Sequence, residues 1–173
     1  IGAQPDGKII IGGDFGCVGN IYQKRLARLN ADGSVDQSFG YTAASPGGQV
    51  NSIVFQPDGK ILVGGLYVGS DNSPFVSITR LNSDGTTDAT FIQGNLPSNR
   101  GIKQIALQPD GKIVIIYTTA VANRQPSGGI ARLNADGSLD STFASSFPFP
   151  FETVAVQADG KILVGGLFSF GFV

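Results

Sequence analysis

Short runs of apolar residues recur along the chain at a fixed interval, and each follows a polar turn phrase. The phrase is QPDGK at Gln4, Gln56 and Gln108 and QADGK at Gln157, so the first three copies stand 52 residues apart and the last follows after 49. The apolar runs behind it are Ile9–Ile11, Ile61–Val63, Ile113–Ile116 and Ile162–Val164. Uninterrupted runs of this length are expected of strands covered on both faces. The period indicates one supersecondary unit repeated along the chain.

The turn phrase predicts a tight hairpin in each repeat. Val50 to Gln56 forms one strand, Pro57-Asp58-Gly59 reverses the chain, and Lys60 to Val63 begins the next strand. Proline presets the first turn residue, aspartate tolerates the second, and glycine supplies the left-handed residue of a three-residue loop. In this register Gln56 faces Lys60 and Phe55 faces Ile61.

A second phrase predicts a second hairpin. RLNADGSVDQSF from Arg28 returns as RLNSDGTTDATF from Arg80 and as RLNADGSLDSTF from Arg132, again with glycine third in the loop. Pairing outward from the turn places Asn82 opposite Thr86 and Arg80 opposite Asp88. If such Arg–Asp pairs are exposed, each contributes only about 0.2–1 kcal/mol, so they set the register and do not supply the stability.

Two hairpins in each repeat predict a four-stranded antiparallel meander, which is one blade of a β-propeller. The expected fold is all-β, with a repeat of about 52 residues and a partial ring of three complete blades plus one hairpin. Residues 1–173 then form part of a single propeller domain, with repeats at approximately 1–49, 50–101, 102–150 and 151–173 (incomplete). Helical solenoids and leucine-rich arrays fit less well, because their units are helices or shorter coils. We expect the remaining blades to come from missing sequence or from another chain.

Residues that recur in every copy are interpreted as structural. An active site needs one unique arrangement of residues, whereas every blade needs the same residues to fold. The outer strand, Ser34 to Phe39 and its copies, is more polar and carries one large inward aromatic residue. The recurring residues are the turn residues Asp6, Gly7, Asp58, Gly59, Asp110, Gly111, Asp159 and Gly160, the pairs Arg28 with Asp36, Arg80 with Asp88 and Arg132 with Asp140, and the aromatics Phe39, Phe91 and Phe143.

Composition excludes several classes of partner. The formal net charge of −1 argues against nucleic acid, which calls for a basic surface. No apolar stretch approaches the ~20 residues of a membrane helix, so we expect no membrane insertion. Cys17 is the single cysteine and no histidine is present, so we expect Cys17 to be a small packed residue.

The two linked phrases, QPDGKIxxGGxF followed by RLNxDGSxDxSF, resemble the delta-60 repeat family over essentially the whole chain. The resemblance implies propeller blades of bacterial secreted or surface proteins, or of phage structural proteins. It therefore implies an extracellular, cell-surface or virion location and an adhesive role without catalytic residues. Ala158 departs from the pattern by replacing the turn proline. Ile116-Tyr117 also departs, because Gly-Gly stands there in the other copies, but both changes leave the blade intact.

The sequence does not predict an enzyme. Repeated aspartates lack the unique arrangement that an acid/base pair needs, and Asp14, Asp71 and Glu152 share no motif. Asn30 to Asp36 superficially suggests a calcium loop, but its glycine and acid spacing does not fit an EF-hand, so we expect neither a metal nor a cofactor.

The connections between the second and third strands differ freely between copies and are the best candidates for ligand binding. They are Gly16 to Lys24, Val68 to Phe75 and Thr118 to Gly128. The aromatic stretch Phe147 to Phe151 is expected either to wedge between blades or to form an exposed patch. The candidate ligand-binding residues are Tyr22, Tyr67, Asp71, Asn72, Phe75, Tyr117, Asn123 and Arg124.

Aromatic side chains cover the apolar faces of sugars while amide, carboxylate and guanidinium groups reach hydroxyls. We therefore expect a non-enzymatic recognition or adhesion module that binds a surface glycan or a protein receptor. One alternative is a structural spacer in a surface fibre or phage tail appendage. A second alternative is the non-catalytic portion of a polysaccharide hydrolase or lyase.

Overall fold

The computed structural model of the chain describes residues 1–41, 47–68, 74–92, 100–119, 127–143 and 151–166. Within these ranges the regular structure is antiparallel β-strand, as the sequence predicts, and no helix occurs, membrane-spanning helices included. In chain order the strands are β1 (Gly2–Ala3), β2 (Ile9–Gly12), β3 (Cys17–Val18), β4 (Ile21–Tyr22), β5 (Leu26–Leu29), β6 (Gly47–Phe55), β7 (Ile61–Val68), β8 (Pro74–Leu81), β9 (Arg100–Leu107), β10 (Ile113–Thr119), β11 (Ser127–Leu133), β12 (Phe151–Val156) and β13 (Ile162–Gly166).

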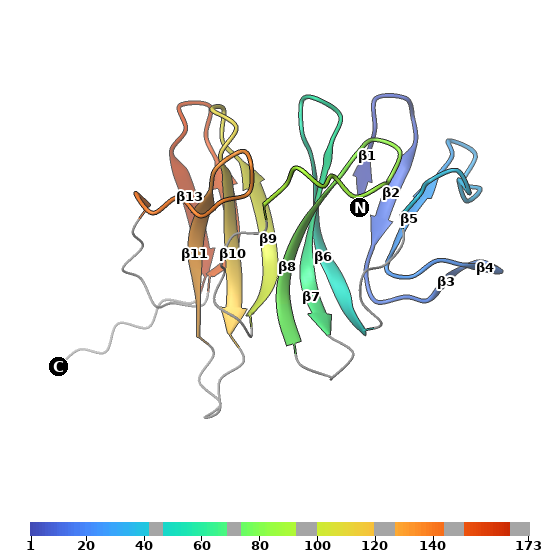
Figure 1. Ribbon diagram of the computed structural model, residues 1–173, viewed down its shortest axis with the longest axis horizontal. Helices are drawn as coiled ribbons and strands as arrows, with labels where there is room; N and C mark the ends of the chain where they lie inside the picture. Colours follow the sequence, from blue (N-terminus) through green and yellow to red (C-terminus); the bar gives the residue numbers. More distant parts are fainter. Residues whose placement is uncertain (42–46, 69–73, 93–99, 120–126, 144–150, 167–173) are drawn as a thin grey trace.

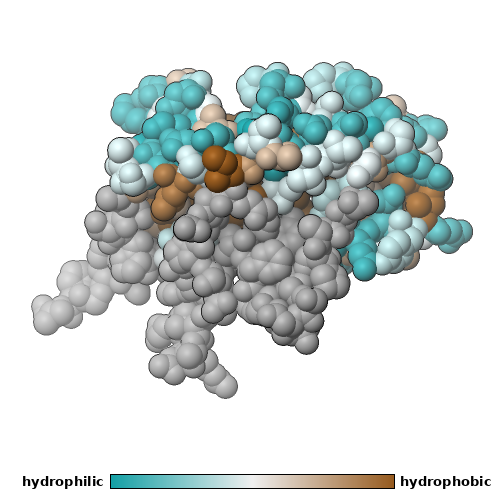
Figure 2. Space-filling model, in the orientation of Figure 1, coloured by the Kyte–Doolittle hydropathy of each residue, from teal (hydrophilic) through white to brown (hydrophobic). Residues whose placement is uncertain are grey.

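Each repeat contributes one small sheet, and the sheets stand side by side in chain order without closing into a ring (Figure 1). The strand orders are β1-β2-β5, β6-β7-β8, β9-β10-β11 and β12-β13. The strands β3 and β4 form a separate two-stranded hairpin inside the connection from β2 to β5. The tight turns lie along one edge of the array, and hydrophilic residues gather on this edge (Figure 2). The β3–β4 hairpin projects from the first sheet away from this edge.

The first hairpin has the predicted register. Phe55 is paired with Ile61, and the Gln56 amide donates to the Lys60 carbonyl oxygen at 2.8 Å. The third turn residue has a positive φ in every copy: 83° at Gly7, 84° at Gly59, 85° at Gly111 and 81° at Gly160. Glycine tolerates this conformation without steric strain, which explains its place in the phrase. The Asp58 carboxylate also accepts the Lys60 amide at 3.1 Å, as expected of an Asx turn.

The second hairpin also has the predicted register, but the fourth strand was wrongly predicted. The Asn82 amide donates to the Thr86 carbonyl oxygen at 2.8 Å, and Leu81 is bridged to Thr87. The predicted pairing of Arg80 with Asp88 is also present, since the Asp88 amide donates to the Arg80 carbonyl oxygen at 2.9 Å. Pairing ends there, because the Asp88 carboxylate accepts the Thr90 amide at 3.0 Å and curls the chain into a turn. The segments around Val35 and Leu139 behave in the same way. Each of the first three blades therefore has three strands and one bridge, whereas the described part of the fourth has two strands.

The sheets are held together by apolar side chains that interdigitate between neighbouring blades. Ile10 of β2 packs with Ile61 and Val63 of β7, and all three are buried. Leu62 on the other face of β7 packs with Ile113 and Ile115 of β10 in the same manner. The predicted burial of the second strand on both faces is thus confirmed for β7 and β10, where it is the main source of stability. It is not found in β13, where Leu163 and Val164 are exposed.

The Gly-Gly pairs allow close approach between neighbouring strands. A Cβ on Gly64 would lie 2.8 Å from side-chain atoms of both Ile102 and Ile105 in the next blade. A Cβ on Gly65 would lie 2.0 Å from the Gln49 carbonyl oxygen, where β6 carries a bulge. In the third blade Ile116 and Tyr117 occupy these positions, and β10 continues through them, so the blade is intact.

Two further expectations concern single features of the chain. Cys17 is exposed, so the prediction of a packed residue is wrong: it lies at the start of β3, in a hairpin that projects from the sheets (Figure 1). Most of the Phe147 to Phe151 stretch lies outside the described residues, but Phe151 itself begins β12 and is buried against Val154 and Ile116.

Candidate functional site

The connection from Gly16 to Lys24 is the one candidate loop that the structure describes throughout. Val18 pairs with Ile21 across Gly19-Asn20, and Gly19 has a φ of 58°, as a two-residue hairpin turn requires. Tyr22 is paired with Cys17 and is 66% exposed. The Lys24 ammonium nitrogen lies 5.5 Å from the centre of the Tyr22 ring. The hairpin therefore presents an aromatic face and a cation to solvent.

Arg25 anchors this hairpin to the next blade. Its φ of 66° makes it the non-glycine residue with a left-handed backbone among the described residues, a conformation that costs energy unless its surroundings stabilise it. Its guanidinium donates to the Asp14 carboxylate at 2.5 Å and to the Gly48 carbonyl oxygen of β6. Its backbone amide also donates to the Phe15 carbonyl oxygen at 3.0 Å. Sequence reasoning missed Arg25, because Arg25 belongs to no repeated phrase.

The other predicted ligand-binding residues fall into two groups. Tyr67 and Phe75 are partners across β7 and β8, and Tyr117 lies within β10, half-buried over Gly129. These three are thus strand residues near the ends of the sheets. The residues that lie outside the described part of the chain are Asp71, Asn72, Asn123 and Arg124.

The second aspartate in each copy of the second phrase lies at the centre of an ionic cluster. Asp88 is buried, and one carboxylate oxygen accepts from Arg80 Nε and from Lys60 Nζ, both at 2.7 Å. The other oxygen accepts the Thr90 amide and hydroxyl. The Arg80 guanidinium also stacks on Phe91, 4.8 Å from the ring centre. The same cluster surrounds Asp36 and Asp140.

These clusters also join neighbouring blades. Arg28 Nη1 donates to the Ser83 carbonyl oxygen, and Arg80 Nη1 donates to the Ala135 carbonyl oxygen, each at 2.7 Å and each in the next repeat. The pairs of Arg28 with Asp36 and Arg80 with Asp88, predicted as register pins, are therefore buried cross-links between blades. In all three clusters a lysine from the first hairpin also bonds to the aspartate, and the sequence reasoning did not assign it there. Their carboxylates serve the scaffold and are closed to substrate.

The hydrogen bonds explain the acidity of these aspartates. Donation from Lys60, and then from Thr90, lowers the pKa of Asp88 well below its ordinary value. Lys8 and Ser38 lower the pKa of Asp36 in the same way, and Lys112 and Thr142 lower that of Asp140. A carboxyl group with a lowered pKa in the folded state stabilises the fold above its unfolded pKa of about 3.9 and loses that contribution as the pH falls further.

We therefore expect the free energy of unfolding to fall steeply as the pH is lowered from about 4 to about 2. It should change little between about pH 5 and 8, because the sequence contains no histidine. Urea unfolding followed by circular dichroism across this range measures the effect. The Asp88→Asn variant lacks one of the three carboxylates and should show a shallower acid dependence. An acid dependence equal to that of the unaltered chain would contradict the role of Asp88.

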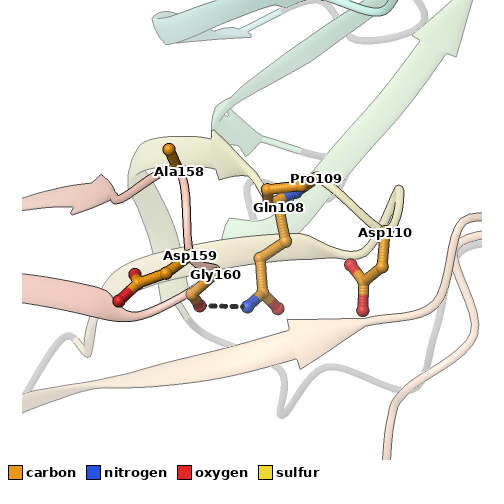
Figure 3. A pocket seen from close by; sticks show the side chains of 6 residues that line it. All are labelled: Gln108, Pro109, Asp110, Ala158, Asp159 and Gly160. Atoms are coloured by element: carbon orange, nitrogen blue, oxygen red, sulfur yellow. Dashed lines mark hydrogen bonds between the residues drawn. The ribbon is translucent and has the colours of Figure 1, made fainter.

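A small pocket lies between the first turns of the third and fourth repeats (Figure 3). Gln108 donates from Nε2 to the Gly160 carbonyl oxygen at 2.8 Å, and its buried Oε1 has no hydrogen-bond partner. Asp110 and Asp159 lie on either side of it, and Asp159 pairs with Lys161. The pocket can therefore accept a hydrogen-bond donor. Gln4 and Gln56, at the equivalent positions of the first two repeats, also have a buried Oε1 without a partner. We therefore interpret the pocket as a feature of the junction between blades and not as a specific binding site.

Metal-ligating side chains do not gather in the described ranges, where no three of the cysteine, aspartate or glutamate side chains could hold one ion. Among the candidate ligand-binding residues, the structure shows Tyr22 as an exposed aromatic side chain with a cation, Lys24, beside its ring.

Comparison with protein families agrees with this architecture. A family model described as a domain of unknown function (DUF5122) β-propeller matches residues 4–39, 56–91, 108–143 and 157–172, which together make up more than half of the chain. Each full match runs from the glutamine of the first turn phrase to the phenylalanine that follows the second hairpin. The description of the family gives a fold and no function. No curated protein matches the chain.

Proposed function

The chain belongs to the DUF5122 β-propeller family, and from this premise we propose that it is a non-enzymatic recognition module. In this proposal the blades form a rigid scaffold and the connections between second and third strands contact the partner. The partner is a surface glycan or a protein receptor, and the location is extracellular, on a cell surface or on a virion. The two linked phrases further support an assignment of the repeats to the delta-60 type.

The observation that carries this proposal is the exposed Tyr22 ring on the β3–β4 hairpin. Its neighbour Lys24 adds a cation, and Arg25 fixes the base of the hairpin to the second blade. An aromatic side chain held on a rigid support can cover an apolar sugar face or fill a pocket in a protein at low entropic cost. The carboxylates of Asp36, Asp88 and Asp140, in contrast, are buried in the scaffold.

Glycan-array and cell-binding measurements test the proposal. The Tyr22→Ala variant is expected to lose about tenfold or more in affinity, the effect of removing an aromatic anchor. Its stability should change by less than about 0.5 kcal/mol, since the side chain is exposed. Leu139→Ala is the matched control, because Leu139 is also a large exposed apolar residue but lies in the second hairpin of the third blade. Equal binding by both variants would remove Tyr22 from the site.

The structural spacer is the second candidate, and the cross-links between blades favour it. Arg28 and Arg80 each bond to the following repeat, so the array resists separation of its blades. Absence of binding to any glycan or cell surface would favour the spacer. Turnover of a polysaccharide by the protein would contradict both candidates and favour a hydrolase or lyase.

A further inference from the structure

Lys24 differs from the other cations of the chain in its pairing. Every other lysine and arginine whose side chain the structure describes forms an ion pair with an aspartate or a glutamate. Lys24 forms no such pair within the described residues, which include every acidic side chain of the sequence except Asp71. Its ammonium group instead lies over the Tyr22 ring, 5.5 Å from the ring centre. The described part of the chain therefore leaves the charge of Lys24 without a counter-charge.

Asp14 is the one acidic residue in the connection from β2 to β5, and it is engaged by another cation. Its carboxylate accepts a hydrogen bond from the Arg25 guanidinium at 2.5 Å. The same guanidinium donates to the Gly48 carbonyl oxygen of β6, so Arg25 holds Asp14 at the base of the hairpin. The connection thus carries one compensated cation, Arg25, and one uncompensated cation, Lys24.

A strained turn fixes the backbone of Lys24. The Leu26 amide donates to the Lys24 carbonyl oxygen at 2.8 Å, and Arg25 between them has a φ of 66°. This is a γ-turn of the rare kind with positive φ, a conformation that persists where the surrounding structure stabilises it and that is frequent at binding sites. The bonds of Arg25 and the pairing of Tyr22 with Cys17 provide that stabilisation. Lys24 and Tyr22 are therefore positioned before a partner arrives, which lowers the entropic cost of binding.

The charges elsewhere on the surface favour the hairpin as the place where an anion binds. The aspartate of every tight turn is exposed, and the turns form the hydrophilic edge of the molecule (Figure 2). The β3–β4 hairpin projects from the first sheet away from this edge (Figure 1). A polyanion is therefore repelled by the turn edge and attracted to the uncompensated Lys24.

We propose that the hairpin binds an acidic glycan, whose sugar units carry a carboxylate. The proposal rests on the recognition function proposed above and names the class of its glycan. The sugar carboxylate binds the Lys24 ammonium and draws it off the Tyr22 ring, because a charge-assisted hydrogen bond is stronger than a cation–π contact at an exposed site. The ring face that the ammonium leaves is then open to the apolar face of the same sugar.

The pair of side chains favours a sugar over an acidic peptide. A carboxylated sugar has a charged group and an apolar ring face on one rigid unit, as a site with one cation beside one aromatic ring requires. Aspartate and glutamate side chains offer the carboxylate without a ring face beside it. An acidic peptide therefore satisfies Lys24 but not Tyr22.

The test uses the full chain on a glycan array that carries uronic-acid and sialic-acid glycans, each next to its carboxyl-reduced form. We expect binding to carboxylated glycans, about tenfold weaker after reduction of the carboxyl groups. The Lys24→Gln variant should lose about tenfold in affinity for the carboxylated form and stay within about twofold for the reduced form. The Lys24→Arg variant keeps the charge and should retain most of the affinity. The Tyr22→Ala variant should bind both forms more weakly.

Lys103→Gln is the matched control, because Lys103 is also a partly exposed lysine but lies on β9 and pairs with Glu152. Its affinity should stay within about twofold of that of the unaltered chain. Circular dichroism shows that each variant is folded, as we expect for Lys24, which takes part in no ion pair of the described residues.

The outcomes separate this proposal from the recognition function itself. Binding of neutral glycans that Tyr22→Ala weakens and Lys24→Gln does not would overturn the acidic class and leave recognition by the hairpin intact. Binding of polyglutamate as tight as that of the carboxylated glycans would overturn the glycan as partner. Absence of binding to any glycan would overturn this proposal, and the cell-binding measurement would then decide between a protein receptor and the structural spacer.

Discussion

Replacing Asp88 with alanine is expected to lower the free energy of unfolding by about 2–3 kcal/mol. The carboxylate is 5% exposed and accepts hydrogen bonds from Arg80, Lys60 and Thr90. Its removal leaves the half-buried Arg80 guanidinium without a counter-charge, and it releases the turn that ends the second hairpin. Because the partly exposed Lys60 can return to solvent, we expect a value below that of a fully buried pair.

The matched control is Asp58→Ala in the same blade. The Asp58 carboxylate is exposed and accepts only the Lys60 amide within its own turn, so we expect a loss of about 0.5 kcal/mol. Urea unfolding of the two variants measures the difference. Equal losses would mean that Asp88 stabilises only its own turn. The interpretation of its cluster as a buried cross-link between blades would then be wrong.

Replacing Gly65 with alanine is expected to cost about 3 kcal/mol or more. The added Cβ would lie 2.0 Å from the Gln49 carbonyl oxygen and 3.1 Å from the Val50 Cα. These are backbone atoms at the bulge in β6, so no side-chain rotation relieves the contact. The pairing of β6 with β7 therefore has to open locally, and the hydrogen bonds around the bulge are lost.

The first blade supplies the control for this substitution. Gly13 occupies the same position in its repeat, but a Cβ there would meet only the Phe15 ring, at 3.5 Å, an ordinary van der Waals contact. Gly13→Ala should therefore change stability by less than about 0.5 kcal/mol. The comparison is made by thermal or urea unfolding of both variants. If Gly13→Ala is as damaging as Gly65→Ala, the glycine is needed for its backbone freedom and not for the close approach.

Equivalent positions of the repeat thus have different environments. Tyr117 stands at the place of Gly13 and Gly65 in the third blade, although the pairing of β9 with β10 carries there the same register shift as the pairing of β6 with β7 at Gly64 and Gly65. The repeated phrase specifies the hairpins, while the packing of each blade on its neighbours decides which side chains its strands tolerate. Variation concentrates where no neighbour constrains it, as in the hairpin that carries Tyr22.

Local signals predicted the hairpins correctly. The proline, aspartate and glycine of the first turn fix its length, and the register of Phe55 with Ile61 follows from that length alone. The prediction of a fourth strand was wrong for an equally local reason. The Asp88 carboxylate accepts the Thr90 amide, so that amide is not available for strand pairing. No pattern in the sequence indicated the role of Arg25, because that role depends on its hydrogen bond to Gly48 in the next blade.

The amino-acid sequence was enough to predict the repeat, the tight turns, the pairing of the first three strands in each blade and the burial of Ile61–Val63 and Ile113–Ile116 on both faces. These depend on residues close together in the chain, where turn chemistry and side-chain alternation act. The three-dimensional structure was needed to show that the Arg–Asp pairs are buried, that Lys60 bonds to Asp88, and that Arg80 reaches Ala135. Burial and charge pairing depend on which residues from distant parts of the chain, in the same or the next blade, meet at one point, and a repeated phrase does not carry that information.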